Sequence, residues 1–275
     1  MTKKKGMVKM SKLPDENHIR ISVAMAVYNA EKYIRKMLDS IVPQLRSCDE
    51  LVISYNESSD ATWDIILSYS KKYPNVYVVT CEKTGIIPNF ENAIRHCRGR
   101  YILLADQDDV WTDAKVECMY KAFKYSKKAV VLHDCLYVTS SLRPMNRRLS
   151  DRGLRAGSFY NLVKNSYQGS CMGFRRSVIP AILPIPEGIA MHDQWIGIIG
   201  NIVGGTYIMK ERLMLYRQHE GNSSSDRLPI LRKLRYMFIM AMELQKRMRK
   251  ILFVRSYIMA GKGKNANFCR VVRQS

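Results

Sequence analysis

The chain has 275 residues, enough for one large domain with a substantial buried core and an appendage. Its 47% hydrophobic and 25% charged residues are ordinary for a soluble globular protein, but its net charge of +21 is not. More than half of that charge lies in residues 227–275, where 13 Lys and Arg residues accompany a single acid, Glu243. A basic appendage of this kind is typical of a protein that meets an anionic surface.

No segment has the character of a membrane signal. The lysines near the N-terminus are not followed by the apolar region of a signal peptide, and no window reaches the roughly 18 uncharged apolar residues of a membrane span. The seven cysteines form no CxxC pair and no metal-finger spacing, so we expect reduced, mostly buried thiols. These features predict that the body of the protein lies in the cytoplasm.

Strands and helices alternate in the first part of the chain. The apolar runs predict strands at 21–27, 51–54, 75–80 and 101–105, and the helical periodicity between them predicts helices at 31–41, 61–73 and 89–97. This alternation predicts an α/β fold with a mostly parallel, doubly wound sheet and helices on both faces. Ligands of such sheets bind beyond the carboxyl ends of the strands, so the residues that follow each strand are the candidates.

The pattern loosens after Trp111. A helix at 113–126 and a strand at 129–132 precede a basic stretch at 143–155 that we interpret as a loop. An apolar helix follows near 193–203, then two short strands near 206–216. The last segment, 228–257, predicts an amphipathic helix with clustered Arg and Lys. Its expected apolar side consists of Leu231, Leu234, Met237, Phe238, Ala241 and Leu244.

The strongest chemical feature is the acidic cluster Asp106-Gln107-Asp108-Asp109, which directly follows the strand at 101–105. Three carboxylates that close repel one another and lose hydration, unless a cation compensates them. Mg²⁺ or Mn²⁺ suits the position, because such an ion takes one or two carboxylates and leaves its other sites to phosphate oxygens and water. The alternative is a solvated acidic turn in which Asp109 or Asp113 caps the next helix; the position at the end of a strand favours the metal.

Five motifs in order then resemble the family 2 glycosyltransferases with the GT-A fold, closest to their bacterial rhamnosyltransferase-like branch. The resemblance runs from about Ile21 to Ser225. The motifs are Val27 to Ile34, Gly85 to Ala93, Asp106 to Trp111, His192 to Trp195, and Tyr216 to His219 with Gly221-Asn222. The resemblance implies an inverting, metal-dependent transfer of a sugar from a nucleotide-diphosphate-sugar, dTDP-rhamnose or a UDP-hexose, to a hydroxyl of a glycan or lipid-linked acceptor in cell-surface polysaccharide synthesis.

The resemblance also implies roles for particular residues. Asp193 matches the family's catalytic base, and its alternative is a helix N-cap. Mg²⁺ or Mn²⁺ is expected on Asp108, Asp106 and His219. The residues expected to contact the donor are Tyr28, Asn29, Asn56, Asn89, Asp106 and Arg217. Those expected to contact the acceptor are His192, Trp195 and Trp111.

The chain departs from the family after the second strand. Members usually carry an Asp-Asp-Gly-Ser type motif there, with an Asp that contacts the nucleobase, whereas this chain has Tyr55-Asn56-Glu57-Ser58. The Asn56 amide could donate to and accept from a base edge, and Tyr55 could stack on the base. We therefore expect the nucleotide to be recognised differently, or less tightly, than in the family; lost activity is the other interpretation.

The predicted organisation has three parts. Residues 1–18 form a basic flexible tail, and 19–226 form the GT-A domain, with a nucleotide-binding half at 19–111 and an acceptor half at 112–226. Residues 227–275 form a basic helical tail, which either brings the enzyme to the inner face of the cell membrane as a peripheral contact or packs on the domain. The alternatives are a nonenzymatic basic protein that binds nucleic acid or a membrane surface, and a nucleotidyltransferase on a similar sheet. We expect no nucleic-acid partner, because the charge is concentrated at the C-terminus and no recognition motif is present.

Overall fold

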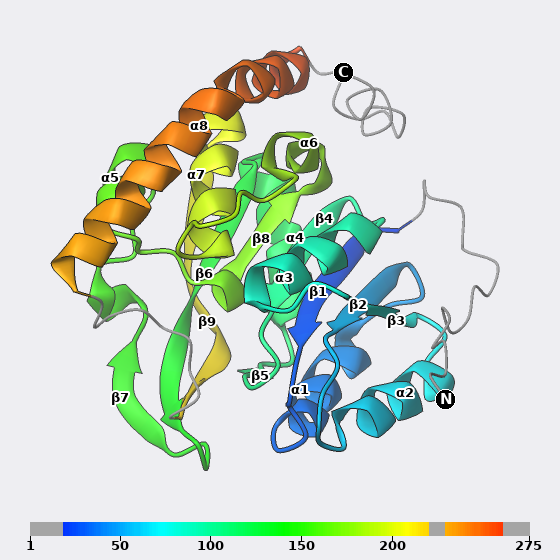
Figure 1. The fold of residues 1–275 in the computed structure, drawn as a ribbon. Coiled ribbons are helices and arrows are strands. Elements are labelled where there is room, and N and C mark those ends of the chain that lie inside the picture. Colours follow the sequence, from blue (N-terminus) through cyan, green and yellow to red (C-terminus); the bar gives the residue numbers. More distant parts are fainter. Residues whose placement is uncertain (1–18, 220–228, 261–275) are drawn as a thin grey trace.

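A computed structural model describes residues 19–219 and 229–260 (Figure 1). The predicted tail at 1–18, the motif Gly221-Asn222 and the end of the basic tail lie outside the described residues. The strands are β1 (Ile21–Val27), β2 (Asp49–Tyr55), β3 (Val76–Thr80), β4 (Tyr101–Ala105), β5 (Val110–Trp111), β6 (Val130–Thr139), β7 (Pro144–Arg148), β8 (Met172–Arg175) and β9 (Thr206–Gln218). The helices are α1 (Ile34–Ile41), α2 (Thr62–Lys72), α3 (Ile86–His96), α4 (Lys115–Ser126), α5 (Ser158–Val163), α6 (Ile179–Ile182), α7 (His192–Gly204) and α8 (Ile230–Met259).

The first four strands form the predicted parallel half of the sheet, in the order β3-β2-β1-β4. Val27 pairs with Tyr55, and Met25 pairs with Ala105, so β1, β2 and β4 end near the same edge. Every residue of β1 and β4 is buried, and apart from Ser22 all are apolar or aromatic, as expected of parallel strands covered on both faces. The register therefore delivers the residues after each strand to one place.

The other half of the sheet is mixed. β8 lies antiparallel between β4 and β6, and β9 runs parallel to β6 and antiparallel to β5. The predicted α/β GT-A-like class is confirmed, with the parallel pattern limited largely to the first half. Two expectations about elements were wrong: the basic stretch contains β7, and the two short strands are one 13-residue strand, β9. β7 was hidden because all five of its residues are exposed, so no apolar alternation marks a strand held by backbone pairing with β6.

Helices cover both faces of the sheet, and side chains alternate between two cores. Val23 and Met25 of β1 face a core with α1, α2 and α4, whereas Ala24 and Ala26 face the core that contains α3, α6, α7 and α8. The six cysteines described are all free; Cys97, Cys135 and Cys171 are buried, and the other three are half-buried. Within residues 19–219 and 229–260, no helix combines the length and the apolar character needed to span a bilayer.

Helix α7 packs closely on the Tyr167 ring and on the start of β6 through three glycines. A Cβ atom on Gly197 would lie 2.4 Å from the Tyr167 ring, one on Gly200 would lie 2.2 Å from Val130 Cγ2, and one on Gly204 would lie 2.9 Å from Ala129 Cβ. The spacings of three and four residues place all three glycines on one face of the helix. This close approach sets the position of the first turn of α7, which carries His192 and Asp193.

We expect Gly200→Ala to lower the free energy of unfolding by about 1–3 kcal/mol, because the added methyl meets the stiff, buried Val130 side chain. The same substitution in an unobstructed helix would raise stability by about 0.5–1 kcal/mol. Urea unfolding of the two proteins measures the sign directly. A stabilised variant would contradict the close contact between α7 and the sheet.

Candidate active site

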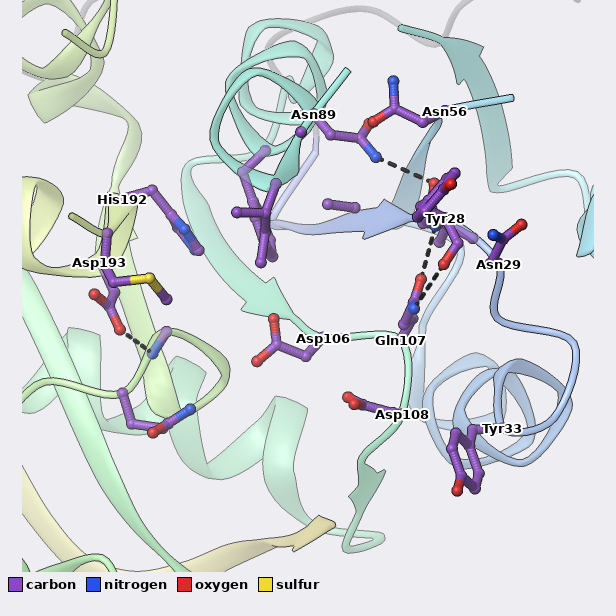
Figure 2. Close-up of a pocket in the computed structure, with 18 of the residues that line it drawn as sticks. Tyr28, Asn29, Tyr33, Asn56, Asn89, Asp106, Gln107, Asp108, His192 and Asp193 are labelled. Carbon is purple, nitrogen blue, oxygen red and sulfur yellow. Dashed lines mark hydrogen bonds between the residues drawn. The ribbon is translucent and has the colours of Figure 1, made fainter. Parts of the chain in front are cut away.

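A cavity of about 1350 Å³ opens at the carboxyl ends of β1, β2 and β4. Both halves of the domain line it (Figure 2). From the parallel half come the predicted Tyr28, Asn29, Asn56, Asn89, Asp106 and Asp108, and from the mixed half come His192, Asp193 and His219. Nine of the predicted site residues, from six separate segments, are thus brought to one cavity.

The three carboxylates of the acidic cluster have different surroundings. Asp106 and Asp108 line the cavity, and Figure 2 shows both pointing into it. Asp109 is fully buried; its Oδ1 accepts the backbone N–H of Arg217 at 3.0 Å. Within the described part of the chain its Oδ2 has no hydrogen-bond partner. Asp109 therefore belongs to the support of the cluster, and Asp106 and Asp108 are the groups available to a ligand.

The cluster is short of compensating charge. Desolvation, together with the neighbouring Asp108 and Asp193, raises the pKa of Asp106 to about 7. Burial, Asp108 and Asp106 raise the pKa of Asp109 well above its ordinary value. The buried Lys115 lies nearby, but its ammonium donates to the Ser170 carbonyl at 2.7 Å, and burial lowers its pKa to about 8. A further positive charge at Asp106 and Asp108 would stabilise both carboxylates.

Arg217, near the end of β9, and His219, just after it, contact the acidic cluster. The Arg217 Nε donates to the Asp108 carbonyl at 2.6 Å, and the guanidinium lies 4.6 Å from the centre of the Tyr33 ring. The His219 Nε2 lies 2.7 Å from the Asp108 Oδ2, and its ring stacks on Tyr33. Arg217 is buried and does not line the cavity, so the predicted direct contact of this side chain with a donor is corrected. It positions the loop that carries Asp108.

These residues fit a small divalent cation. Of the described residues, no group of three or more His, Cys, Asp and Glu side chains could hold a metal alone. Asp106 and Asp108 supply hard carboxylate oxygens, with the His219 imidazole nitrogen beside Asp108. Mg²⁺ and Mn²⁺ suit such a partial ligand set, since they accept water and phosphate oxygens at the remaining positions.

Gln107 joins the two central strand ends, a role that the sequence analysis missed. Its Oε1 accepts the Tyr28 N–H at 2.8 Å and its Nε2 donates to the Tyr28 carbonyl at 2.9 Å (Figure 2). The side-chain amide thus pairs with the backbone after β1 as a neighbouring strand would. Asn29 continues the link: it accepts the Ser59 N–H at 2.9 Å, and its positive φ of 43° is tolerated by Asn. The position of Gln107 directly after β4 was the available signal.

The departure at Tyr55-Asn56 has a structural role. Both hydrogens of the Asn56 amide donate to backbone, at 2.9 Å to the Cys81 carbonyl and 3.0 Å to the Lys83 carbonyl. The expectation that this amide donates to a nucleobase is therefore corrected. Tyr55 is buried beside Trp63, and its hydroxyl accepts the Ser58 N–H at 2.8 Å, so it does not stack in the cavity. Asn89 remains available, because its Nδ2 binds the Val27 carbonyl whereas its Oδ1 has no partner among the described residues.

Asp193 faces the acidic cluster from the first turn of α7. The N-cap position belongs to Met191, so the alternative role of Asp193 as the N-cap is wrong. Its Oδ2 accepts the Gly169 N–H at 3.0 Å (Figure 2). Its Oδ1 accepts the Gln194 N–H at 2.6 Å. Burial raises the pKa of Asp193 to about 6, against the opposing effect of these hydrogen bonds. A carboxylate with this pKa is ionised at neutral pH and is still basic enough to take a proton.

His192 lies beside Asp193 and stacks on Phe90, with ring centroids 4.0 Å apart. Burial lowers its pKa to about 3, so the ring is neutral at physiological pH. Within residues 19–219 and 229–260, neither ring nitrogen has a hydrogen-bond partner. A neutral imidazole offers one donor and one acceptor, which suits the hydroxyl groups of a polar ligand.

The two predicted acceptor-binding tryptophans do not reach the cavity. Trp195 is fully buried in the core, and its Nε1 donates to the Ile182 carbonyl at 2.9 Å. Trp111 is buried on the other face of the sheet, with the Lys115 ammonium 3.9 Å from its ring centre. The expectation that Trp195 and Trp111 contact the acceptor is therefore corrected. Each ring follows a polar motif in the sequence, but its side chain is buried in a core.

Arg152 is a cavity residue that the sequence analysis did not single out. It lines the wall near Asp193, and its Nη1 lies 3.3 Å from the Tyr137 hydroxyl. Its positive charge is among the effects that lower the pKa of Asp193. The sequence shows the basic stretch that contains Arg152. It does not show that this stretch folds back to line the cavity with Asp193. Lys32, Asn165 and Tyr167 also line the cavity without having been predicted.

Comparisons with known proteins agree with this geometry. The sequence model for Glycosyl transferase family 2 matches residues 22–183, more than half of the chain. An uncharacterized protein of Mycobacterium tuberculosis is 27% identical over 210 residues, which cover 72% of this chain and 59% of that protein. The poly(ribitol-phosphate) beta-glucosyltransferase of Bacillus spizizenii is 33% identical over 114 residues, covering 40% of this chain and 18% of that protein. This chain thus spans less than two thirds of these relatives.

Two solved structures show the same fold. S. aureus TarS 1-349 in complex with UDP-GlcNAc has a TM-score of 0.65 at 20% identity, over 82% of this chain and 66% of that chain. Mannosyltransferase PcManGT from Pyrobaculum calidifontis, in complex with GDP-Man and Mn²⁺, has a TM-score of 0.61 at 17% identity, over 98% and 77%. Both support a GT-A-like arrangement of the sheet.

We expect Asp108→Asn to weaken Mn²⁺ binding at least tenfold in the presence of UDP, because it removes a charged oxygen ligand from a site with few others. Electron paramagnetic resonance of free Mn²⁺ measures the affinity. Glu57→Gln is the matched control, since Glu57 is an exposed carboxylate that lines the same cavity away from the cluster. Equal affinities for the wild type and Asp108→Asn would contradict the assignment.

Proposed function

This chain belongs to glycosyl transferase family 2. We propose that it moves a sugar from a nucleotide-diphosphate-sugar to an acceptor hydroxyl, with inversion at the anomeric carbon. The observation that carries the proposal is the pairing of two carboxylate sites across one cavity. Asp106 and Asp108 lie at the end of β4, and Asp193 enters from α7. One site suits a diphosphate with its metal, and the other suits a base.

The donor diphosphate would lie against Asp106 and Asp108, which would hold Mg²⁺ or Mn²⁺. That ion would neutralise negative charge that builds on the leaving diphosphate. The Mn²⁺ in the complex of PcManGT supports this choice of cofactor. Tyr28, Asn29 and Asn89, around the ends of β1 and α3, would contact the nucleoside, with the loop at Thr84-Gly85 nearby.

Asp193 would be the catalytic base. Its carboxylate would take the proton from the acceptor hydroxyl while that oxygen bonds to the anomeric carbon and the bond to the diphosphate breaks. The Gly169 N–H holds one oxygen of this carboxylate, so the group is oriented before the acceptor arrives. His192 would bind a sugar or acceptor hydroxyl through its neutral ring.

As part of the same proposal, we infer a donor of dTDP-rhamnose or a UDP-hexose, and a glycan or lipid-linked acceptor in cell-surface polymer synthesis. The similarity to a poly(ribitol-phosphate) beta-glucosyltransferase supports the polymer context. Arg152 beside Asp193 would suit an acceptor with negative charge. The enzyme would work at the inner face of the cell membrane, in peripheral contact. Family membership favours this proposal over a nucleotidyltransferase or a nonenzymatic binding protein.

Asp193→Asn is expected to lower kcat by about 10²–10⁴-fold while donor binding stays within a factor of three, because an amide cannot accept the acceptor proton. A panel of nucleotide sugars, with product detection by mass spectrometry, first identifies the working donor. Asp64→Asn is the control, as Asp64 is an exposed carboxylate on α2 outside the cavity. Full activity of Asp193→Asn would exclude this residue as the base.

The pH dependence gives a separate test. Because Asp193 must be ionised to act and its pKa is raised to about 6, kcat/KM at saturating Mn²⁺ should rise with pH, with a midpoint near pH 6, and level off about one pH unit higher. The Asn165 amide, 3.3 Å from the Asp193 Oδ1, lowers that pKa, so Asn165→Ala should move the rise to higher pH. A profile that is flat between pH 5 and 8 would contradict a titrating base of this pKa.

A further inference from the structure

Helix α8 is fixed to the domain by one side. Met240, Leu244, Ile251 and Val254 are buried in the core shared with α6 and α7. The Arg247 guanidinium adds hydrogen bonds to the carbonyls of residues 181, 182 and 184, at 3.2, 3.1 and 2.8 Å. In Figure 1 the helix runs across α7 on the outside of the molecule. Of the apolar side predicted from the sequence, Leu244 is buried in this core, whereas Leu231, Leu234 and Phe238 are exposed.

The opposite side of α8 carries a second apolar surface. Of the fifteen exposed large hydrophobic side chains in the described residues, nine belong to this helix, so they are concentrated and not scattered. Leu231, Leu234, Phe238 and Met242 follow one another at spacings of three and four, which places them on one side. We call the following set the outer face: Ile230, Leu231, Leu234, Phe238, Met242, Met248, Leu252, Phe253 and Met259. Phe159 and Val163 of the neighbouring α5 are exposed as well.

The outer face is embedded in positive charge. Residues 230–259 contain eight Lys and Arg and one acid, a net charge of +7. The acid, Glu243, is already paired with Lys246 at 2.6 Å. Six of the basic residues are exposed: Arg232, Lys233, Arg235, Lys246, Arg249 and Arg255. Their long side chains can lie along the apolar residues while the charged ends reach outward.

We propose that the outer face of α8 docks on an anionic lipid surface, with the helix axis parallel to the membrane. An apolar stripe with basic flanks enters the headgroup boundary, and anionic lipids neutralise the charge. The helix presents about 45 Å of such surface. A second copy of the chain fits less well, because it would bring two helices of charge +7 together. Nucleic acid would satisfy the charge but leave the apolar stripe in water.

Docking would also orient the cavity. α8 packs on α7, and the first turn of α7 carries Asp193, so a helix held flat on lipid fixes the direction from which an acceptor reaches the base. A lipid-linked acceptor would then approach from the surface to which the enzyme is bound. This consequence rests on the proposed function, whereas the lipid docking itself does not.

The test is co-sedimentation of the full chain with vesicles of phosphatidylcholine alone or with about one third phosphatidylglycerol. We expect at least tenfold tighter binding to the anionic vesicles. The triple variant Leu234→Gln, Phe238→Gln, Leu252→Gln should lose at least tenfold in that affinity, since Gln keeps helix propensity and removes the apolar surface. Tyr125→Gln, at an exposed aromatic on α4, is the control and should bind as the wild type does.

Three results would overturn the proposal: wild-type protein that does not bind anionic vesicles, a triple variant that binds as the wild type does, or a wild-type dimer that the triple variant converts to a monomer in light scattering. Circular dichroism and thermal unfolding establish that the triple variant is folded. Its turnover of a soluble acceptor should equal that of the wild type, which separates a failure of docking from a failure of the proposed function.

Discussion

The main physical constraint on the cavity is the free-energy cost of placing several carboxylates close together where few water molecules can solvate them. Asp106 and Asp109 lie close enough to each other and to Asp108 for burial and repulsion to raise their pKa values. The Arg217 backbone N–H donates to Asp109, and the His219 ring contacts Asp108. The Lys115 ammonium donates to the Ser170 carbonyl instead. The divalent cation proposed at Asp106 and Asp108 would offset this repulsion.

The second carboxylate site depends on how closely α7 approaches the sheet. Glycines on one face of that helix permit a separation that side chains would prevent, and the first turn then reaches the cavity. Asp193 is buried there among backbone donors, which orient the carboxylate and limit the rise in its pKa. The other side of α7 supports α8, so Asp193, the sheet and the outer face form one packed unit.

Sequence patterns predicted the parallel half of the fold well, because its strands are rich in apolar residues and their register is simple. The residues after those strands were accordingly found in the cavity. Sequence patterns could not predict β7, because none of its residues is buried. They also could not predict the directions of Trp111 and Trp195, whose side chains are buried in cores that tertiary packing defines. The sequence did not indicate the roles of Asn56 and Gln107, because both side chains form hydrogen bonds with the backbone of loops that are distant in sequence.

Helix α8 illustrates the same limit. Its sequence contains apolar residues on two opposite sides, and periodicity alone cannot say which side meets the domain. In the structure one side of α8 packs on the core and the other side is exposed. Packing and surface attraction are compatible because they use different residues of one helix.

A crystal structure of the chain with Mn²⁺ and a nucleotide sugar that the enzyme cannot turn over would show whether Asp106 and Asp108 hold the donor diphosphate across the cavity from Asp193. Anomalous scattering locates the Mn²⁺ without assumption. The account predicts Mn²⁺ at about 2.2 Å from an Asp108 carboxylate oxygen, with the anomeric carbon between the diphosphate and Asp193. Mn²⁺ bound elsewhere, or a sugar directed away from Asp193, would contradict it.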